Sequence, residues 1–382
     1  MRIGFDLRPA WSKHSRRRGV GKYTHQLAAA LAAANQEHEL VFFTTRGQPV
    51  PQPCHSNIVL RSLTRPHRLN WVLDCWQLPV ESRSGQLELF QATEITAIPS
   101  TGAPRIWAHV HDLIPYLFWD QVGAQFPWDF RFALKIARRR FSRAALLITD
   151  SVHSQQDLCR ELNLPEDRVK VIHAASHERF KPQPQERSAE RIKRKYRISG
   201  QFLFYVGGTD FRKNLPRLVE AFALLRDRGF AGRLVLAGES FRWNIPETRE
   251  IRTLIGHLGL SEWVDMPGYV PDEDLPDFYS ACRVFVFPSL YEGFGLPVLE
   301  AIQCGAVVAA SQASSIPEVG GGAVQYFDPE SVESLVGALE VACADEGRRD
   351  QLQAAARHQA GRFSWQKTAR QLLQLYATEL GS

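Results

Sequence analysis

Two glutamates, Glu292 and Glu300, lie eight positions apart on either side of a turn that contains Gly293 and Gly295. Glycine lets the backbone adopt conformations closed to other residues and lets a ligand approach the chain closely. The amides of such a turn, and of a helix that begins there, can hold an anion, while carboxylates accept hydrogen bonds from hydroxyl groups. The spacing therefore predicts a site for a ligand that carries both a diphosphate and vicinal hydroxyls.

The flanking elements must position these carboxylates. Residues 284–287 are continuously apolar and predict a buried strand, and residues 297–303 predict a helix with Pro297 at its favoured first position. Glu300 then lies in the first helical turn, and Glu292 lies on the preceding loop. A plain strand-to-helix turn would explain either glutamate alone, but the whole string of residues 288–300 combines several independent features.

That string, PSLYEGFGLPVLE, matches the E-x7-E pattern of retaining glycosyltransferases of family 4, and the chain resembles the mannosyltransferase-like branch most. The resemblance implies an α/β chain with the GT-B fold, in which two Rossmann-like doubly wound parallel-sheet domains face a central cleft. It implies that Glu300 holds the ribose hydroxyls of a nucleotide sugar donor and that Glu292 holds its sugar hydroxyls. The implied contacts within the turn are Gly293, Phe294, Gly295 and Leu296.

A second glycine turn, GGTDFRKN at residues 207–214, follows a predicted strand and opens a helix. Gly208 permits close approach, and Arg212 and Lys213 offer a guanidinium fork and a point charge for phosphate oxygens. A turn with solvated basic residues is the alternative. The resemblance implies that the pair neutralises the diphosphate leaving group. Many family members place the arginine at the Gly208 position, so the match is closer for Lys213.

A third glycine motif, RGVGKY at residues 18–23, follows the first predicted strand and precedes a predicted helix over 22–33. It lacks the spacing of a Walker A loop, and Thr24 stands where a dinucleotide fingerprint needs its third glycine. The motif is similar to the first-loop glycines of the mannosyltransferase-like branch. That similarity implies Gly19 and Gly21 beneath the donor diphosphate and beside the acceptor, with a plain tight turn as the alternative.

Two histidines, His109 and His111, end a predicted strand over 106–110, where ligand-facing residues belong. Their spacing places both on one face, which would also suit a metal ion, but no third ligand is evident. His111 begins a string that resembles the family's H-D-L motif, which implies contact with donor sugar hydroxyls or with the reacting centre. We therefore expect a metal-independent site with no cofactor.

Three acidic residues, Asp272, Glu273 and Asp274, match the D-x-D pattern that holds metal in the other glycosyltransferase fold. Acidic residues are expected at a helix start for capping alone, and we favour that interpretation. The resemblance places the turn just before them beside the nucleotide base, at Tyr269 and Val270.

Apolar strand patterns alternate with helical ones from end to end, which predicts parallel sheets with helices on both faces. A chain of 382 residues is too long for a single hydrophobic core, so we expect two domains. We expect an N-terminal acceptor-side domain over 1–180 and a nucleotide-sugar-binding domain over 181–363, with a polar linker at 178–187. The resemblance alone implies that the helix in 364–382 returns to the first domain. The predicted strands are 3–7, 40–44, 58–60, 87–90, 106–110, 146–149, 169–172, 202–206, 234–237, 263–266, 284–287, 307–310 and 324–327.

The cysteine content and the lengths of the apolar runs indicate where in the cell the protein works. The six cysteines are scattered without a C-x-x-C pair, which argues against zinc and disulfides and suits a reducing cytoplasm. The chain has no run of 18 apolar residues, so we expect no membrane-spanning helix. The first predicted strand leaves no room for a signal peptide. A cytoplasmic protein, peripheral on the inner face of the membrane, is expected.

The chain has a net charge of +5, and its basic residues cluster at residues 16–18 and 130–143. In the second cluster apolar residues recur at helical spacing, so one stripe is apolar and the rest is cationic. The ordinary interpretation is a helix face exposed to solvent. The more specific interpretation is contact with an anionic membrane surface or a phosphorylated acceptor. Nucleic acid is a weaker third choice, and we expect no nucleic-acid partner, because no nucleic-acid-binding motif accompanies the charge.

We therefore predict a retaining hexosyltransferase that moves mannose from GDP-mannose to a hydroxyl of a glycan or lipid-linked acceptor in cell-envelope polysaccharide biosynthesis. The donor base stays open between GDP, UDP and ADP. A nucleotide-sugar epimerase of the same fold and a non-catalytic nucleotide-sugar binder are the alternatives. A nicotinamide dehydrogenase is disfavoured because the dinucleotide fingerprint fails.

Overall fold

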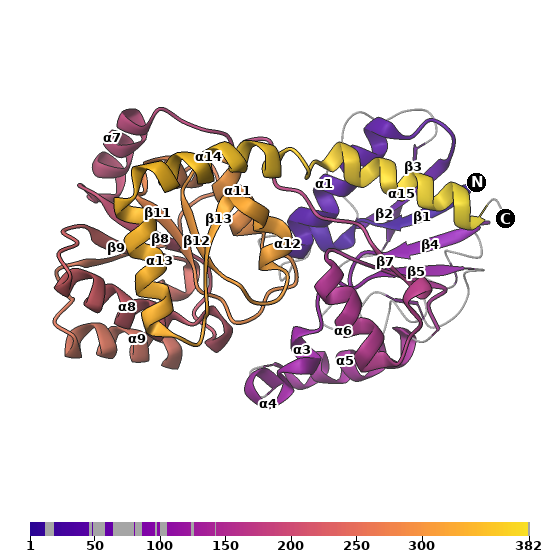
Figure 1. Cartoon of the computed structure of the whole chain (residues 1–382). Coiled ribbons are helices and arrows are strands. Elements are labelled where there is room, and N and C mark those ends of the chain that lie inside the picture. Colours follow the sequence, from indigo (N-terminus) through magenta and orange to yellow (C-terminus); the bar gives the residue numbers. More distant parts are fainter. Residues whose placement is uncertain are drawn as a thin grey trace. The chain divides into compact units, whose positions relative to one another are not determined.

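The computed structural model of the chain describes residues 1–11, 19–45, 48, 58–63, 80, 86–95, 98–99, 105–123, 126–141 and 143–380 (Figure 1). The chain forms two compact units. Unit 1 comprises Met1–Ala175 and Ser364–Ser382, and unit 2 comprises Ser176–Phe363. Each unit contains its own parallel sheet. The basic cluster at residues 16–18 lies outside the described residues.

Unit 1 is built on a seven-stranded sheet in the order β3-β2-β1-β4-β5-β6-β7, in which every pair is parallel. The strands are β1 (Arg2–Asp6), β2 (Glu39–Thr45), β3 (Ile58–Leu63), β4 (Leu89–Ala92), β5 (Ile106–His109), β6 (Leu146–Thr149) and β7 (Val169–Val171). The strand order reverses beside β1, which has β2 on one side and β4 on the other. Ligands of open parallel sheets bind at the carboxyl ends of the strands near such a reversal.

The helices of unit 1 are α1 (Gly19–Ala34), α3 (Ile114–Leu117), α4 (Trp119–Val122), α5 (Trp128–Phe141), α6 (Val152–Leu162) and α15 (Trp365–Leu380), with 3-10 turns η1 (Arg8–Ala10) and η4 (Glu166–Arg168). The C-terminal helix α15 packs against α1. Ser364 caps this helix, since its Oγ accepts a hydrogen bond from the Lys367 amide at 3.3 Å.

Helix α1 begins earlier than the sequence predicts, at Gly19 instead of residue 22. Tyr23, Leu27 and Leu31 recur every four residues and are buried in the core, so packing extends the helix despite the cost of about 1 kcal/mol for each helical glycine. Gly19 and Gly21 are therefore helical residues, the first exposed and the second buried, and do not form a loop.

Unit 2 is built on a six-stranded parallel sheet in the order β10-β9-β8-β11-β12-β13. The strands are β8 (Phe202–Val206), β9 (Arg233–Ala237), β10 (Val264–Gly268), β11 (Val284–Phe287), β12 (Val308–Ser311) and β13 (Val324–Phe327). The order reverses between β8 and β11, and these two strands lead into the two glycine turns singled out from the sequence. All of the predicted strands are confirmed, with ends that differ from the observed ones by at most a few residues.

The helices of unit 2 are α7 (Gln185–Tyr196), α8 (Leu215–Asp227), α9 (Pro246–His257), α10 (Leu275–Ala281), α11 (Leu296–Gln303), α12 (Ile316–Gly320), α13 (Val332–Ala344) and α14 (Glu346–Ala360), with 3-10 turns η5 (Phe211–Lys213), η6 (Glu239–Arg242) and η7 (Gly321–Ala323). The predicted linker at 178–187 is too long, because α7 already begins at Gln185. Ser188 and Ile192, four residues apart, bury one face of this otherwise charged helix.

Candidate functional site

The turn after β11 leads directly into α11. Gly295 caps the helix with φ of +105°, a conformation that glycine adopts without strain. Pro297 is the second helical residue and Glu300 the fifth. The expectation that Glu300 lies in the first helical turn is therefore wrong, because the helix starts one residue earlier than predicted.

The carboxylate of Glu300 is held by α10. The Tyr279 hydroxyl donates a hydrogen bond to Glu300 Oε2 at 3.0 Å. Tyr279 is fully buried, and this burial, together with the neighbouring Glu300 carboxylate, raises the pKa of Tyr279 well above its usual value. The phenol therefore remains a donor at all physiological pH values and fixes one oxygen of Glu300.

The second glycine turn meets the first through an ion pair. Lys213, in η5 after β8, places its Nζ 2.5 Å from Glu292 Oε1. The two side chains are 14% and 13% exposed, so the pair is largely shielded but still reachable by solvent. The ammonium also lies 5.5 Å from the centre of the Phe287 ring. The structure thus brings together two predicted site residues that are far apart in the sequence.

Arg212 is anchored to both turns. Its guanidinium lies 2.9 Å from Asp210 Oδ1, and its Nη1 donates to the Tyr291 carbonyl at 3.3 Å. The Leu290 amide donates back to the Arg212 carbonyl at 2.7 Å. The Nε of Arg212 has no hydrogen-bond partner among the described residues. Asp210, which the sequence analysis did not single out, therefore sets the orientation of a predicted phosphate-binding side chain.

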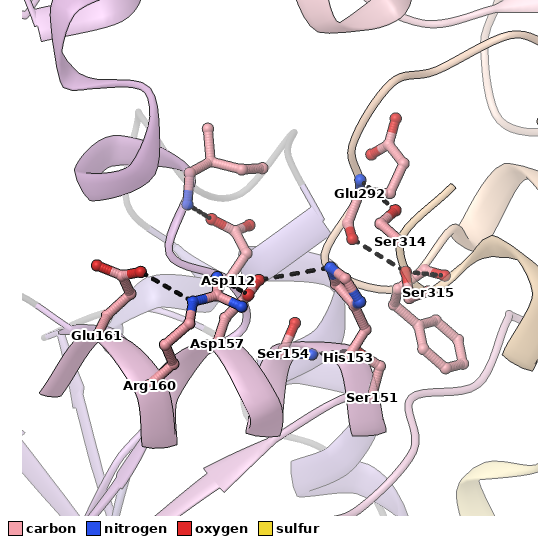
Figure 2. Close-up of polar contacts among 12 residues, drawn as sticks. Asp112, Ser151, His153, Ser154, Asp157, Arg160, Glu161, Glu292, Ser314 and Ser315 are labelled. Atoms are coloured by element: carbon pink, nitrogen blue, oxygen red, sulfur yellow. Dashed lines mark hydrogen bonds and ion pairs between the residues drawn. The ribbon is translucent and has the colours of Figure 1, made fainter. Parts of the chain in front are cut away.

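A pair of serines from the loop between β12 and α12 holds the turn that carries Glu292 (Figure 2). The Glu292 amide donates to Ser314 Oγ at 2.9 Å. Ser315 Oγ lies 3.0 Å from the Glu292 carbonyl and 2.9 Å from the Phe294 carbonyl, and Ser315 is fully buried. Ser314 has a φ of +51°, an uncommon backbone conformation for a residue other than glycine. The sequence offers one signal for this role, two adjacent serines at a helix start.

The same contacts reduce the number of amides left for an anion. The Glu292 amide is satisfied by Ser314, the Val298 amide donates to the Gly295 carbonyl at 3.0 Å, and Pro297 has no amide hydrogen. The expectation that the amides of the turn and of the first helical turn are all free is therefore wrong. Fewer backbone donors are therefore available to an anion at this turn than the sequence predicts.

The other predicted donor contacts of unit 2 differ in exposure. Tyr269 is 41% exposed, whereas Val270 is 3% exposed and its side chain belongs to the core. Val270 would therefore contact a ligand only through its main chain. Gly208 lies in the loop after β8, and its carbonyl accepts a hydrogen bond from the Tyr205 hydroxyl at 2.7 Å.

In unit 1 the predicted site histidine is paired with a carboxylate. His111 Nδ1 lies 2.7 Å from Asp150 Oδ2, and its Nε2 lies 3.3 Å from the Thr93 carbonyl. Burial acts to lower the pKa of His111, but Asp150, Asp112 and the Thr93 carbonyl raise it, and the net pKa is above the usual value. Both ring nitrogens face acceptors, which favours the imidazolium form. The sequence analysis did not identify Asp150.

The pKa of the neighbouring His109 is shifted in the opposite direction. It is fully buried, and its Nδ1 lies 3.1 Å from the Tyr23 hydroxyl, while its Nε2 contacts the Gln91 amide. Burial, with His111 nearby, lowers the pKa of His109 well below its usual value. Gln91 also contacts the Tyr376 hydroxyl, so this network ties α1 and α15 to the sheet. His109 is a neutral core residue.

Helix α6 follows Asp150 and carries polar contacts among its own residues (Figure 2). Ser151 caps it by accepting the Ser154 amide at 3.1 Å. Asp157, only 2% exposed, pairs with Arg160 at 2.5 Å and with His153 at 3.5 Å. The Asp157 carboxylate therefore pairs with two side chains of its own helix.

The described residues contain no cluster of three or more histidine, cysteine, aspartate or glutamate side chains suited to a metal ion.

Asp274, at the start of α10, contacts Lys195 and accepts a hydrogen bond from the Tyr196 hydroxyl at 2.5 Å. Its side chain makes no capping bond, so the capping interpretation is wrong for Asp274, which pairs with α7 instead. A hollow of about 520 Å³ beside it is lined mostly by charged side chains of α7, of the turn before α10 and of α10 itself.

Comparison with known proteins identifies the family. Residues 17–175 match the model described as Glycosyltransferase Family 4, and residues 188–359 match the model described as Glycosyl transferases group 1. The chain belongs to the glycosyltransferases. This result confirms the family resemblance that rested on the E-x7-E string and the surrounding motifs.

Two curated relatives from Escherichia coli are mannosyltransferases. O-antigen chain mannosyltransferase B is 33% identical over 64% of this chain and 64% of its own length. The serotype-specific mannosyltransferase WbdA is 34% identical over 72% of this chain and 33% of its own length. The chain thus spans less than two thirds of either relative.

Solved structures confirm the fold. Sucrose-phosphate synthase from Thermosynechococcus elongatus superposes with a TM-score of 0.77 at 21% identity, covering 100% of this chain and 99% of the other. Anabaena HepE, solved in complex with UDP-glucose, gives a TM-score of 0.73 at 17% identity over 99% and 100% of the two chains. Both units have Rossmann-like parallel sheets, as expected for the GT-B class.

None of the helices in the described part of the chain is both long and apolar enough to cross a bilayer.

Proposed function

We propose that the chain is a retaining mannosyltransferase that transfers mannose from GDP-mannose to a hydroxyl of a glycan or lipid-linked acceptor in cell-envelope polysaccharide biosynthesis. The observation that carries this proposal is the Lys213–Glu292 pair beside Arg212 and the α11 start, all within unit 2. Cations and carboxylates lie side by side there, as a ligand with both a diphosphate and sugar hydroxyls requires.

The chemistry requires stabilisation of a leaving group. When the bond between the anomeric carbon and the diphosphate breaks, negative charge grows on the phosphate and the sugar becomes oxocarbenium-like. Lys213 and Arg212 would stabilise the phosphate, and loss of one such preorganised donor typically costs ~2.7–4 kcal/mol. Glu292 would hold sugar hydroxyls, and Glu300, fixed by Tyr279, would hold the ribose hydroxyls.

The choice of mannose rests on the relatives. Both Escherichia coli proteins described above are named mannosyltransferases, and one is named for the O-antigen chain. We extend these names to this chain as a proposal for the donor sugar and for the class of acceptor. We further propose that the reaction needs no metal ion, and that it takes place in the cytoplasm at the membrane, where lipid-linked acceptors reside.

A panel of nucleotide sugars tests the donor. GDP-mannose should raise the melting temperature of the chain more than UDP-glucose or ADP-glucose, because binding to the folded state stabilises it by mass action. Preference for UDP-glucose would overturn the assignment of GDP-mannose but leave the transferase proposal standing.

A transfer assay tests the reaction. With GDP-[13C]mannose and an extract of lipid-linked or polysaccharide acceptors, we expect an α-linked product, since retention preserves the α configuration of the donor. A β-linked product would overturn retention. Epimerised donor formed without an acceptor would indicate the epimerase, and binding without turnover would indicate a non-catalytic binder. An unchanged rate in the presence of EDTA is expected, and a loss of activity that Mg²⁺ restores would refute metal independence.

A further inference from the structure

One face of α5 is exposed and carries only aromatic and cationic residues among the side chains that the structure describes. The exposed residues are Trp128, Arg131, Phe132, Lys135, Arg138 and Arg139. They recur at three- and four-residue intervals, the spacing of a single helical face. We call this face the α5 stripe. The opposite face is buried in the core through Ala133, Leu134, Ala137 and Phe141.

The two aromatic residues of the stripe are unusually exposed for their size. The exposed fraction is 74% for Trp128 and 50% for Phe132. The guanidinium of Arg131, between them in sequence, lies 5.4 Å from the centre of the Trp119 ring on α4. Figure 1 shows α3, α4 and α5 close together in unit 1, and the Arg131–Trp119 contact joins α5 to α4. An exposed tryptophan leaves a large apolar surface in water, which an apolar partner would cover.

Aromatic and cationic groups on one helical face match the interface of a bilayer with anionic headgroups. Tryptophan and other aromatic rings settle at the level of the headgroups, while lysine and arginine are attracted by the negative surface potential. We propose that the α5 stripe docks this chain on a membrane that contains anionic lipid. The purpose of docking rests on the proposed function, since it would bring a lipid-linked acceptor to the enzyme, but the binding itself does not.

Charge argues against a second copy of the chain as the occupant. A two-fold interface brings the same patch of both copies together, so the cations of one stripe would face those of the other. Single-stranded nucleic acid also uses cations and stacked aromatic rings, and it is therefore a competing outcome of the test.

Flotation of the full chain with vesicles tests the proposal. We expect binding to phosphatidylcholine vesicles that contain phosphatidylglycerol, little binding to pure phosphatidylcholine, and weaker binding as salt is raised. Absence of binding to the anionic vesicles at low salt would overturn the proposal.

Matched variants locate the binding surface. The triple variant Arg131→Gln/Lys135→Gln/Arg138→Gln should lower the partition coefficient on anionic vesicles by about a hundredfold, because each cation near the surface contributes about fivefold. A control triple variant, Arg187→Gln/Lys193→Gln/Arg194→Gln, removes the same charge from exposed positions of α7 and should change binding by less than about tenfold. Equal losses in the two variants would show that net charge alone acts and would overturn the assignment to α5.

The aromatic residues are tested separately. Trp128→Ala/Phe132→Ala should weaken vesicle binding by about tenfold or more at high salt as well, because apolar insertion is not screened. Retained vesicle binding by this variant would remove the aromatic part of the proposal. Stripe variants that keep vesicle binding but lose binding to a single-stranded RNA would overturn the membrane as the partner.

A donor-binding control separates the two proposals. All α5 variants should keep the rise in melting temperature that GDP-mannose produces in the unmodified chain, because the proposed donor residues lie in unit 2. Vesicle binding without any response to nucleotide sugars would overturn the proposed function and support the docking surface. A nucleotide response without vesicle binding would do the reverse.

Discussion

Lys213 Nζ and Glu292 Oε1 lie 2.5 Å apart in unit 2, although 79 positions separate them in the sequence. The cation proposed to bind phosphate is thus paired with the carboxylate proposed to bind sugar. A nucleotide sugar would give each group a partner of its own, and we place this pair at the centre of the proposed donor site.

Replacement of Lys213 by alanine should lower kcat by about 100- to 1,000-fold, since the ammonium acts on charge that grows in the transition state. Steady-state transfer kinetics with GDP-mannose would measure the change. Lys195→Ala is a matched control, because Lys195 also pairs with a carboxylate, Asp274, but lies on α7. A Lys213→Ala variant with unchanged kcat would contradict the proposed role.

Replacement of Glu300 by alanine should raise the KM for the donor at least tenfold and change kcat less, because ribose contacts act alike in the ground and transition states. Tyr279→Phe removes only the hydroxyl that donates to Glu300 Oε2, so a smaller rise in KM is expected. A larger effect of Tyr279→Phe than of Glu300→Ala would show that the tyrosine acts on the ligand by another route.

Replacement of Ser315 by alanine should destabilise the chain by about 1–3 kcal/mol, because the buried hydroxyl lies between the Glu292 and Phe294 carbonyls. The donor KM should also rise, since these carbonyls belong to the turn that positions Glu292. Ser188→Ala is the control: Ser188 is buried as well but donates to Asp277 at 2.6 Å. We expect it to lower the melting temperature and leave the KM unchanged. An equal effect of both variants on the KM would contradict a positioning role for Ser315.

Replacement of Asp150 by asparagine should lower the pKa of His111, because burial is then opposed only by Asp112 and the Thr93 carbonyl. In the unmodified chain the raised pKa means that the folded state binds the proton more tightly than the unfolded one. This stabilisation is complete below the usual pKa of 6.5 and is lost as pH rises through the folded pKa.

The loss of stability in Asp150→Asn, about 1.5–3 kcal/mol for a hydrogen bond to a charged group, should therefore be largest at acidic pH and shrink as pH rises. Denaturant unfolding at several pH values and NMR titration of the His111 ring would measure both effects. Asp157→Asn is the control, since Asp157 pairs with His153 and Arg160. An unchanged pKa of His111 in Asp150→Asn would refute the coupling.

The strands were predictable because parallel strands buried on both faces have continuous apolar runs, as at residues 284–287 and 202–206. The starts of helices were less predictable. Gly19 and Gly21 have low helix propensity, yet packing of Tyr23 and Leu27 extends α1 through them. The low helix propensity of the two glycines favours a loop, but burial of the apolar face of α1 outweighs it.

The site residues also differ in how far the local sequence identified them. Types and spacing of residues identified Lys213, Glu292 and Glu300, because glycine turns and charged side chains leave a local pattern in the sequence. Asp150 left no such pattern and Ser315 only its place beside a second serine, since their partners, His111 and the carbonyls near Glu292, lie 39 and up to 23 positions away.

The sequence by itself determined the alternation of strands and helices, the two glycine turns and the family, because each depends on residues close together along the chain. Only the tertiary structure decided which carboxylate meets Lys213, which acid holds His111 and which face of α5 is exposed. Those outcomes depend on the order in which the strands pair and on which side chains the cores bury. These are non-local consequences of packing that no short stretch of residues encodes.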